Sequence, residues 1–382
     1  MTESAAVNAK TFVGAFAPPG AVIWLDTAHQ GRLPLVAARE LDTAREWKLH
    51  PEALATSERF SSVPERLRAA IGRLISAPPE TVALANSASY GLHLIANGID
   101  WQLGDEVVVA ANDFPSDVLP WLAQRDRGVV VRQLQPADEV PTVDEVAAAL
   151  SERTRVVCLS WVHSFSGRVL DLEGIGSLCR RRGVWFVVNG AQAVGVRPIA
   201  VDGLPVDALI SVGFKWLCGP YGTGFCYLHP GLREHVNPRK LYWLTALGVE
   251  ELAAPVLDLA AVRPGRTHGI DVFGTANFFN FVPLAASIEL LTGFGIEGIG
   301  RYVDQLVEQI LDGLDRERYR LVSSAEARSS LVVFQPFNES SDAVARRLAA
   351  RDIYVAQRRG RIRVSPHLYN SPADIERLLE HL

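Results

Sequence analysis

The feature that most constrains this chain is an alternation of short apolar strands with helices between residues 81 and 228. Strands are predicted at 81–84, 106–111, 129–134, 156–160, 184–188, 208–212 and 224–228, and helices at 90–97, 118–125, 143–150 and 172–182. The strands are nearly continuous apolar runs, which is typical of a sheet buried on both faces. The alternation predicts an α/β domain with a mostly parallel sheet and right-handed crossovers, in which ligands bind at the carboxyl ends of the strands.

Less regular segments flank this alternation. A strand at 23–25 and helices at 34–49 and 63–75 come before it, and helices at 278–291 and 299–314 come after it. Strands at 331–335 and 362–364 with helices at 342–350 and 372–382 predict a small α+β unit. We therefore predict an N-terminal tail at 1–20, a large domain at 21–280 and a small C-terminal domain at 281–382. The stretch between 237 and 275 is interpreted as an active-site loop.

The composition excludes several classes of function. The 382-residue chain is too long for one small core, and its net charge of −5 comes without a basic block, so no nucleic-acid partner is expected. Its longest apolar runs have strand length, so no membrane span is expected, and residues 1–10 lack the pattern of a signal peptide. Four cysteines without metal-site spacing predict reduced thiols in a cytoplasmic protein and no metal centre.

One lysine stands where a buried strand would open into a cleft. Lys215 follows the apolar run at 208–212, lies between Phe214 and Trp216, and precedes a glycine-rich turn. Burial disfavours the ammonium form and lowers the pKa of a lysine, and a neutral amine is what a Schiff base requires. The alternative interpretation is an ordinary surface lysine at the end of a strand.

Polar groups also follow the other predicted strands. They occur at Ser87–Ser89, Phe114–Asp117, Ser160–Gly167 and Asn189–Gln192. In this order before Lys215, and with the C-terminal segment 361–370, they resemble the class V aminotransferase family of pyridoxal-phosphate (PLP) enzymes of fold type I. That family includes cysteine desulfurases, selenocysteine lyases, kynureninase and isopenicillin N epimerase-like proteins. The resemblance covers residues 22 to 375. It implies the PLP-dependent transferase fold type I with a small C-terminal domain, PLP as cofactor, an amino-acid substrate, and a homodimer with shared active sites.

The resemblance also implies roles for single residues. Lys215 forms the Schiff base with PLP and then serves as general base and acid at the substrate Cα. The implied cofactor-binding residues are Ser87, Ala88, Ser89, Phe114, Asp117, Ser164, Asn189, Gln192, Lys215 and Thr275. Among them, Ser87–Ser89 suit a phosphate at a helix N-terminus, and Thr275 reaches the phosphate of the neighbouring subunit.

The remaining implied roles concern the ring and the substrate. Phe114 stacks on the pyridine ring, Asp117 lies near the cofactor, and Ser164 and Gln192 lie near the ring oxygen. Arg363 binds the substrate α-carboxylate, for which a bidentate guanidinium is suited, and His29 is a further substrate-binding candidate. Tyr242, Trp243 and Arg266 are additional pocket candidates. Each residue also has a structural interpretation as a helix cap, core aromatic, solvated loop residue or surface charge.

The chain departs from the family at several positions. Asn189 stands where relatives have the aspartate that keeps the pyridine nitrogen protonated, so we expect a weaker electron sink. A charge-assisted hydrogen bond contributes about 1.5–3 kcal/mol and a neutral one about 1 kcal/mol. Phe214 and Val212 replace residues that help to hold the phosphate, which predicts weaker PLP retention. No cysteine follows Cys226, so a persulfide-forming desulfurase is not expected.

These departures favour one reaction over the others. Elimination at Cβ drains the negative charge from Cα at once and therefore depends least on a protonated ring. We expect β-elimination of the carbon–sulfur lyase type, in specialised metabolism. Aminotransfer and an isopenicillin N epimerase-like racemisation are alternatives. A degenerate PLP-binding protein without turnover is the alternative outside enzymes, favoured by Asn189 and Phe214 and opposed by Lys215 and Arg363.

Overall fold

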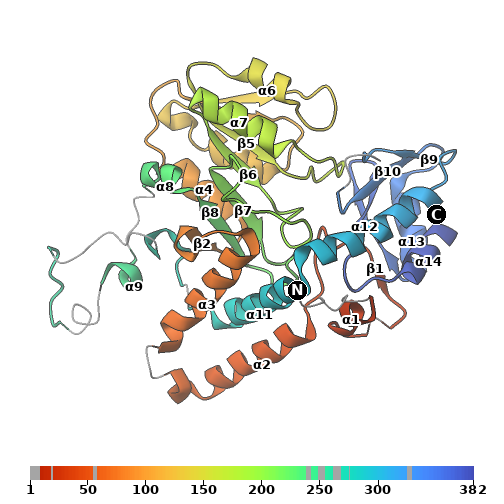
Figure 1. Ribbon diagram of the computed structural model, residues 1–382, viewed down its shortest axis with the longest axis horizontal. Helices are drawn as coiled ribbons and strands as arrows, with labels where there is room; N and C mark the ends of the chain where they lie inside the picture. The colour runs from red at the N-terminus through yellow and green to blue at the C-terminus, as the bar shows by residue number, and fades with distance from the viewer. Residues whose placement is uncertain are drawn as a thin grey trace, which may run out of the picture.

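The structure is a computed structural model that describes residues 9–18, 20–54, 58–237, 242–247, 254–260, 268–274, 276–324 and 329–382. Its centre is a seven-stranded sheet in the order β2-β8-β7-β6-β5-β3-β4 (Figure 1). The strands are β2 (Val82–Ala85), β3 (Glu106–Ala110), β4 (Val130–Leu134), β5 (Thr154–Ser160), β6 (Trp185–Asn189), β7 (Ala208–Val212) and β8 (Gly224–Leu228). All neighbouring pairs are parallel except that β8 runs antiparallel to β7 and β2. The predicted α/β fold with a mostly parallel sheet is confirmed.

Helices cover both faces of this sheet. The ones between its strands are α4 (Ala88–Gly98), α5 (Leu119–Leu122), α6 (Val143–Ala149) and α7 (Leu172–Arg182), and α2 (Leu35–Leu49), α3 (Glu58–Ile75) and α11 (Phe278–Phe294) form a further group (Figure 1). Successive strand residues point to opposite sides, so Val108 belongs to one hydrophobic core while Val107 and Val109 belong to the other. Burial on both faces is the reason why the strands read as continuous apolar runs.

Local signals explain where individual helices begin and end. The Ser87 side chain accepts the backbone N–H of Tyr90 at the start of α4, and the Asp171 side chain caps α7 in the same way. Gly183 ends α7 in the left-handed conformation that glycine adopts without strain. The predicted helix at 118–125 is shorter than expected, because 3-10 turns at Pro115–Asp117 and Arg125–Arg127 bracket the four residues of α5.

The C-terminal part is a four-stranded antiparallel sheet in the order β12-β13-β10-β9. Its strands are β9 (Tyr319–Leu321), β10 (Val332–Pro336), β12 (Ala356–Arg358) and β13 (Arg361–Val364), with helices α12 (Ile296–Gly313), α13 (Ser341–Ala349) and α14 (Pro372–Glu380). Helix α11, which begins near the predicted domain boundary at 280, packs against α2 and α3, whereas α12 packs against α14 and β10. The division at 280 stays a prediction.

The N-terminal segment is attached to this C-terminal unit. Strand β1 (Ile23–Trp24) pairs in parallel with β11 (Ile353–Tyr354). Residues 9–14 form α1, and Phe12 is buried against Phe294 and Tyr302. Within the predicted N-terminal tail at 1–20, two phenylalanines, Phe12 and Phe16, are buried and fill the space beside α12 and the C-terminal unit.

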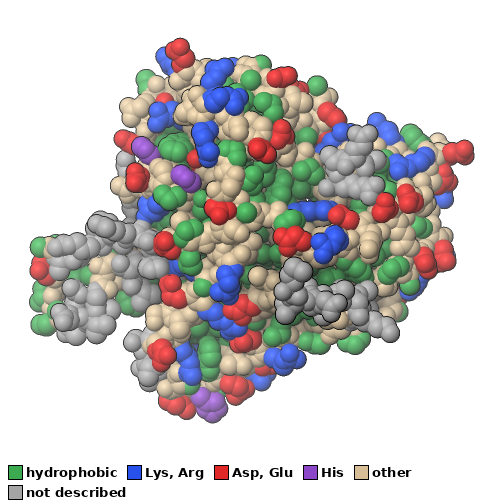
Figure 2. Space-filling view, in the orientation of Figure 1, with side chains coloured by type: hydrophobic (Ala, Val, Ile, Leu, Met, Phe, Trp, Pro, Cys, Tyr) green, Lys and Arg blue, Asp and Glu red, His purple; other side chains and the backbone are tan. Residues whose placement is uncertain are grey.

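The outer surface carries both charge signs. Figure 2 shows acidic and basic side chains interspersed over the face in view. Within the described ranges, no single helix has the length and apolar character to cross a membrane, and only the sharply bent pair α11 and α12 satisfies both criteria when taken together. Of the predicted loop at 237–275, the described part contains the short helix α9 (Trp243–Ala246) and a 3-10 turn at His268–Ile270.

Candidate functional site

A cavity of about 610 Å³ lies at the carboxyl ends of β5 and β6, between the central sheet and the C-terminal unit. Its lining residues are Ala28, His29, Asn86, Ser87, Ala88, Ser89, Phe114, Ser116, Ser160, Val162, Ser164, Phe165, Asn189, Ala191, Gln192, Val212, Phe214, Lys215, Tyr221, Gly222, Arg358 and Arg363. The topology brings them together because polar residues follow adjacent parallel strands, and β13 adds residues from the small unit.

The cavity gathers almost every residue singled out from the sequence. His29, Ser87–Ser89, Phe114, Ser164, Asn189, Gln192, Lys215 and Arg363 line it. Asp117 lies behind the wall, in contact with Asn189. Thr275 and Arg266 lie outside the described residues. Tyr242 and Trp243 are not among the described lining residues, and the Tyr242 hydroxyl instead accepts the backbone N–H of Gly274.

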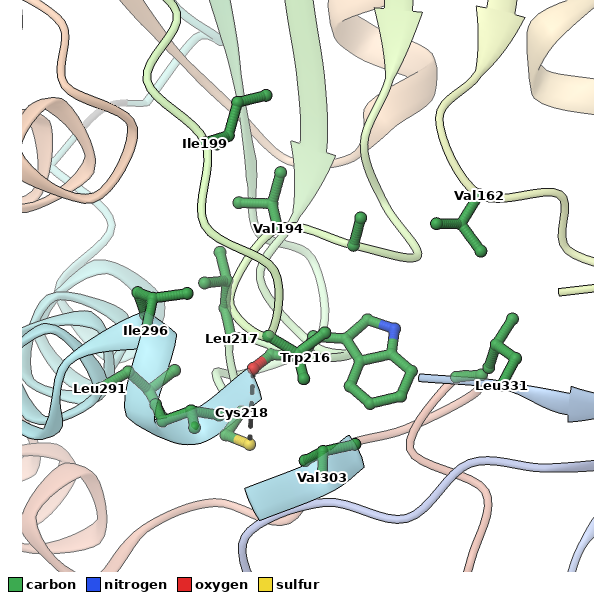
Figure 3. Close-up of a cluster of buried hydrophobic side chains, with 14 of the residues drawn as sticks. Val162, Val194, Ile199, Trp216, Leu217, Cys218, Leu291, Ile296, Val303 and Leu331 are labelled. Atoms are coloured by element: carbon green, nitrogen blue, oxygen red, sulfur yellow. Dashed lines mark hydrogen bonds between the residues drawn. The ribbon is translucent and has the colours of Figure 1, made fainter. Parts of the chain in front are cut away.

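Lys215 is held in place by its own backbone. Its carbonyl accepts the N–H of Cys218 at 3.0 Å, and the adjacent Phe214 carbonyl accepts the N–H of Gly31 at 2.8 Å. Any Cβ at Gly31 would overlap the Lys215 carbonyl oxygen, so only glycine permits this approach. Directly after the lysine, Trp216 and Cys218 are fully buried among aliphatic side chains of α11 and α12 (Figure 3). Packing of these two residues in the apolar core therefore fixes the backbone position of Lys215.

The surroundings of Lys215 favour its neutral form. Burial, and secondly the positive charge of Arg363, lower the pKa of Lys215 from 10.5 to about 8, while Asp117 and Asp26 act in the opposite direction. Its Nζ lies 5.7 Å from the centroid of the Phe114 ring. Near neutral pH a substantial fraction of this amine is unprotonated, which suits a nucleophile or a general base.

The N-terminus of α4 forms one end of the cavity. Ser87 caps the helix, and the exposed Ser89 lies in its first turn. Gly224 makes this arrangement possible, because a Cβ there would meet the Ser211 carbonyl at 2.7 Å and the backbone of Ser87 at 3.2 Å. Hydroxyls and free N–H groups at a helix N-terminus form a site for a phosphate.

Asn189 and Asp117 occupy another wall. Nδ2 of Asn189 donates to Oδ1 of Asp117 at 2.6 Å, and Oδ1 of Asn189 accepts the N–H of Ala191 at 3.0 Å. Asp117 is completely buried, and Ser160 lies 2.9 Å from its other oxygen. Burial and the neighbouring Asp113 raise the pKa of Asp117 well above its usual range.

Gln192 is positioned by two buried contacts. Its Nε2 donates to the carbonyl of Ala28 at 3.1 Å, and its Oε1 accepts the indole N–H of Trp216 at 3.0 Å. The second proton on Nε2 is not used by these bonds, so the amide can still donate toward the cavity. Gln192 therefore links the lysine turn to the N-terminal segment.

Arg363 reaches the cavity from β13. Its Nη1 donates to the Ser164 carbonyl at 3.1 Å and its Nη2 to Oδ1 of Asp26 at 3.2 Å. The side chain is 6 % exposed and its Nε has no hydrogen-bond partner among the described residues, so the guanidinium retains donor capacity in a buried place. Burial lowers the pKa of Arg363 and raises that of Asp26, each partly offset by the other. Such a guanidinium can bind a carboxylate in the cavity.

Sequence reasoning did not single out several lining residues. Phe165 stacks beside Phe114 with ring centroids 6.1 Å apart. Phe214, noted only as a departure, contacts Tyr221 at 4.6 Å between centroids. Arg358 enters from β12. Phe165 lies within the motif 160–167, so the sequence could have indicated it. Arg358 reaches the cavity only because of a turn in the small sheet, which the sequence does not indicate.

The donor set fits PLP. The cavity combines a helix N-terminus for a phosphate, a partly desolvated amine at Lys215, and aromatic and apolar walls at Phe114, Phe165 and Ala191. Asn189 and Gln192 add hydrogen-bonding groups at its edges. An anion, an aldehyde and a flat heteroaromatic ring each find a matching group.

The chain is similar to known proteins over most of its length. The family model Aminotransferase class-V matches residues 35–378. The chain is 28% identical over 304 residues to a probable cysteine desulfurase of Methanothermobacter thermautotrophicus, covering 77% of this chain and 74% of the relative. It is 28% identical over 230 residues to the isopenicillin N epimerase of Streptomyces clavuligerus, covering 58% and 57%.

Solved structures share the fold. A C-DES mutant with glycine covalently linked to the PLP cofactor matches with a TM-score of 0.87 at 23% identity, covering 96% of this chain and 97% of that one. The cystine C-S lyase C-DES in complex with its product cysteine persulfide matches with a TM-score of 0.85 at 23% identity, covering 94% and 97%. The resemblance stated from the sequence, fold type I and PLP as cofactor are confirmed.

Proposed function

Because this chain belongs to the aminotransferase class-V family, whose cofactor is PLP, we propose that it is a PLP-dependent enzyme that cleaves a carbon–sulfur bond in an amino acid by elimination at Cβ. The observation that carries the enzymatic role is Lys215, whose buried amine faces the same cavity as Arg363 and the N-terminus of α4. When bound, PLP supplies an aldehyde that condenses with an amine and a ring that withdraws electrons from Cα.

The residues that line the cavity then have separate roles. Ser87–Ser89 hold the phosphate, and Phe114 packs against the ring. Arg363 orients the α-carboxylate, and Lys215 takes the proton from Cα while a thiolate leaves Cβ. Water completes the reaction by releasing the keto acid and ammonia. A free amine with a pKa of about 8 suits this proton transfer near neutral pH.

The choice of elimination rests on the relatives and on the cysteines. Two of the curated and structural relatives are a probable cysteine desulfurase and a cystine C-S lyase. Here all four cysteines are buried, and none is among the described lining residues. Burial raises the pKa of Cys179 to about 12 and raises that of Cys158, so neither is a thiolate at neutral pH. Carbon–sulfur cleavage without a cysteine nucleophile therefore remains the chemistry that these residues support.

A panel of amino acids and S-conjugates, with products read by mass spectrometry, tests the reaction. Equimolar thiol and keto acid support elimination, whereas stoichiometric transfer of the amino group to an added keto acid contradicts it. Inversion at Cα without bond cleavage would favour racemisation, the second candidate, which the epimerase relative supports. Borohydride treatment of the PLP-loaded protein should attach the cofactor to Lys215, while exposed Lys48 stays unmodified. Absence of attachment would favour a protein without turnover.

We further propose a homodimer with shared active sites, a cytoplasmic location and a role in specialised metabolism. Tyr221 lines the cavity yet is 73 % exposed, and Phe279 is exposed next to Asn280, which approaches Gly222. Large aromatics exposed at a cavity mouth are typical of an interface. Sedimentation of the wild type and of Tyr221→Ser/Phe279→Ser tests the dimer, which the double variant should weaken. Free cysteines support a reducing compartment.

A further inference from the structure

A chain of hydrogen bonds leads from Asn189 away from the cavity to two buried carboxyls. Nδ2 of Asn189 donates to Asp117 at 2.6 Å, the other oxygen of Asp117 lies 2.9 Å from Oγ of Ser160, and Oγ lies 2.7 Å from Oδ1 of Asp113. The orientation of the amide is fixed, because its oxygen accepts the N–H of Ala191. Asn189, Asp117, Ser160 and Asp113 are all buried. Asn189 and Ser160 lie at the cavity wall, whereas Asp117 and Asp113 lie behind it.

The number of protons in this chain of hydrogen bonds follows from its geometry. Ser160 has one hydroxyl proton but faces a carboxyl oxygen on each side, so both contacts are hydrogen bonds only if one carboxyl is protonated. Asp113 accepts the backbone N–H groups of Phe114 at 2.8 Å and Ser160 at 2.9 Å, which suits a carboxylate. Within the described part of the protein, the fully buried carboxyl of Asp117 accepts from no backbone N–H. One proton on Asp117 and one negative charge on Asp113 satisfy every contact.

We propose that Asp117 is a positioning residue that acts through the amide of Asn189, and that the chain Asn189–Asp117–Ser160–Asp113 supplies the negative charge that relatives place directly at the pyridine nitrogen. This inference rests on the proposed function and on the resemblance, in which Asn189 stands where relatives have the aspartate at the pyridine nitrogen. The charge is displaced from the cavity wall rather than lost. A positive charge in the cavity, such as the ammonium of Lys215, favours the ionised form of Asp117. The four residues therefore carry more negative charge when a cation is bound in the cavity.

A charge swap separates this role from a purely structural one. In the double variant Asp117→Asn/Asn189→Asp, the new amide donates to the new carboxylate, and the N–H of Ala191 still finds an acceptor. The hydrogen bond between positions 117 and 189 is preserved while the carboxyl moves to the cavity wall, and the single proton of Ser160 goes either to the new amide oxygen or to Asp113. The single variant Asp117→Asn instead removes the carboxyl beside Asn189 and leaves two facing amides.

The measurement uses the protein loaded with PLP that carries ¹⁵N in its pyridine ring. We record the ¹⁵N chemical shift and, separately, the PLP dissociation constant by equilibrium dialysis. Asp117→Asn should move the shift toward the unprotonated value and weaken PLP binding by about tenfold, the loss of roughly one charge-assisted hydrogen bond. The double variant should restore both quantities to the wild-type values or beyond. Asp126→Asn, an exposed change of the same charge, should alter neither.

Two results would overturn the inference. The first is a folded Asp117→Asn variant with wild-type ¹⁵N shift and PLP affinity. If that variant does not fold, Asn189→Ala is used instead, because it removes the amide through which the carboxyls act, and a wild-type ¹⁵N shift in the folded Asn189→Ala protein overturns the inference. Failure of the wild type to bind PLP is a different outcome, because it would refute the proposed function itself.

Discussion

The lowered pKa of Lys215 predicts that this amine reacts with aldehydes at neutral pH far faster than an ordinary lysine. Its pKa lies at about 8 and the usual value is 10.5. At a pH of about 7.5, roughly one quarter of an amine with the lower pKa is unprotonated, against about one thousandth with the higher pKa. The reactive fraction is therefore roughly two-hundredfold larger, and burial of the amine is the main cause.

The assay follows attachment of PLP to the apo-protein by stopped-flow absorbance from about pH 6 to about pH 10. Each rate is divided by the rate for Nα-acetyl-lysine, which cancels the ionisations of PLP itself. The ratio should be greatest near neutral pH and fall as the reference amine deprotonates, with an inflection in the protein rate near pH 8. Lys48→Gln, which changes an exposed lysine, is the matched control, and Lys215→Gln should abolish attachment.

Two substitutions should move this inflection in opposite directions. Arg363→Gln removes a cation that lowers the pKa of Lys215, so the inflection should shift to higher pH. Asp26→Asn removes a carboxylate that raises the pKa of Lys215, so the inflection should shift to lower pH. A protein rate that rises without inflection to about pH 10, in parallel with the reference amine, would refute a desolvated Lys215.

Three further predictions concern the stability of the apo-protein. Because the pKa of Asp117 is raised by folding, the stability that its neutral form provides is present below its unfolded value and is lost as pH rises through the folded value. The melting temperature of the wild type should therefore fall relative to that of Asp117→Asn as pH rises. Arg363→Gln should lower the unfolding free energy in urea by about 3–5 kcal/mol by leaving Asp26 buried and unpaired, and adding Asp26→Asn should recover part of this loss. Gly31→Ala should lower both stability and PLP affinity, because its Cβ overlaps the Lys215 carbonyl, and an unchanged melting temperature would contradict that placement.

Much of the large domain could be predicted because its signals are local. The apolar run at 208–212 is β7 to the residue, and the Asp171 cap and Gly183 fix α7 as predicted. The site residues could be placed at strand ends for the same reason, since parallel strands bring their carboxyl ends to one edge. A strand, a helix cap and a turn each depend on a few consecutive residues, so each can be recognised locally.

Other features depend on partners that are far apart in the chain. The pairing of β1 with β11 joins residues about 330 positions apart, and two-residue strands carry almost no periodic signal. The contact between Asp117 and Asn189 spans 72 positions. From the sequence, Asn189 indicated only that a negative charge is missing at that position. The sequence does not show that the carboxyl of Asp117, which follows a different strand, lies beside it.

Lys215 shows why the small unit and the N-terminal segment cannot be separated from the catalytic fold. Gly31 donates its N–H beside the lysine, and His367 of the C-terminal unit contacts the Trp216 carbonyl at 3.0 Å. The same two segments bring Asp26 and Arg363 into an ion pair. A shift of the C-terminal unit would therefore move the Arg363 guanidinium and the lysine turn together. This shared scaffold sets the distance between the Lys215 amine and the guanidinium, and the proposed reaction at Cα requires that distance to be fixed.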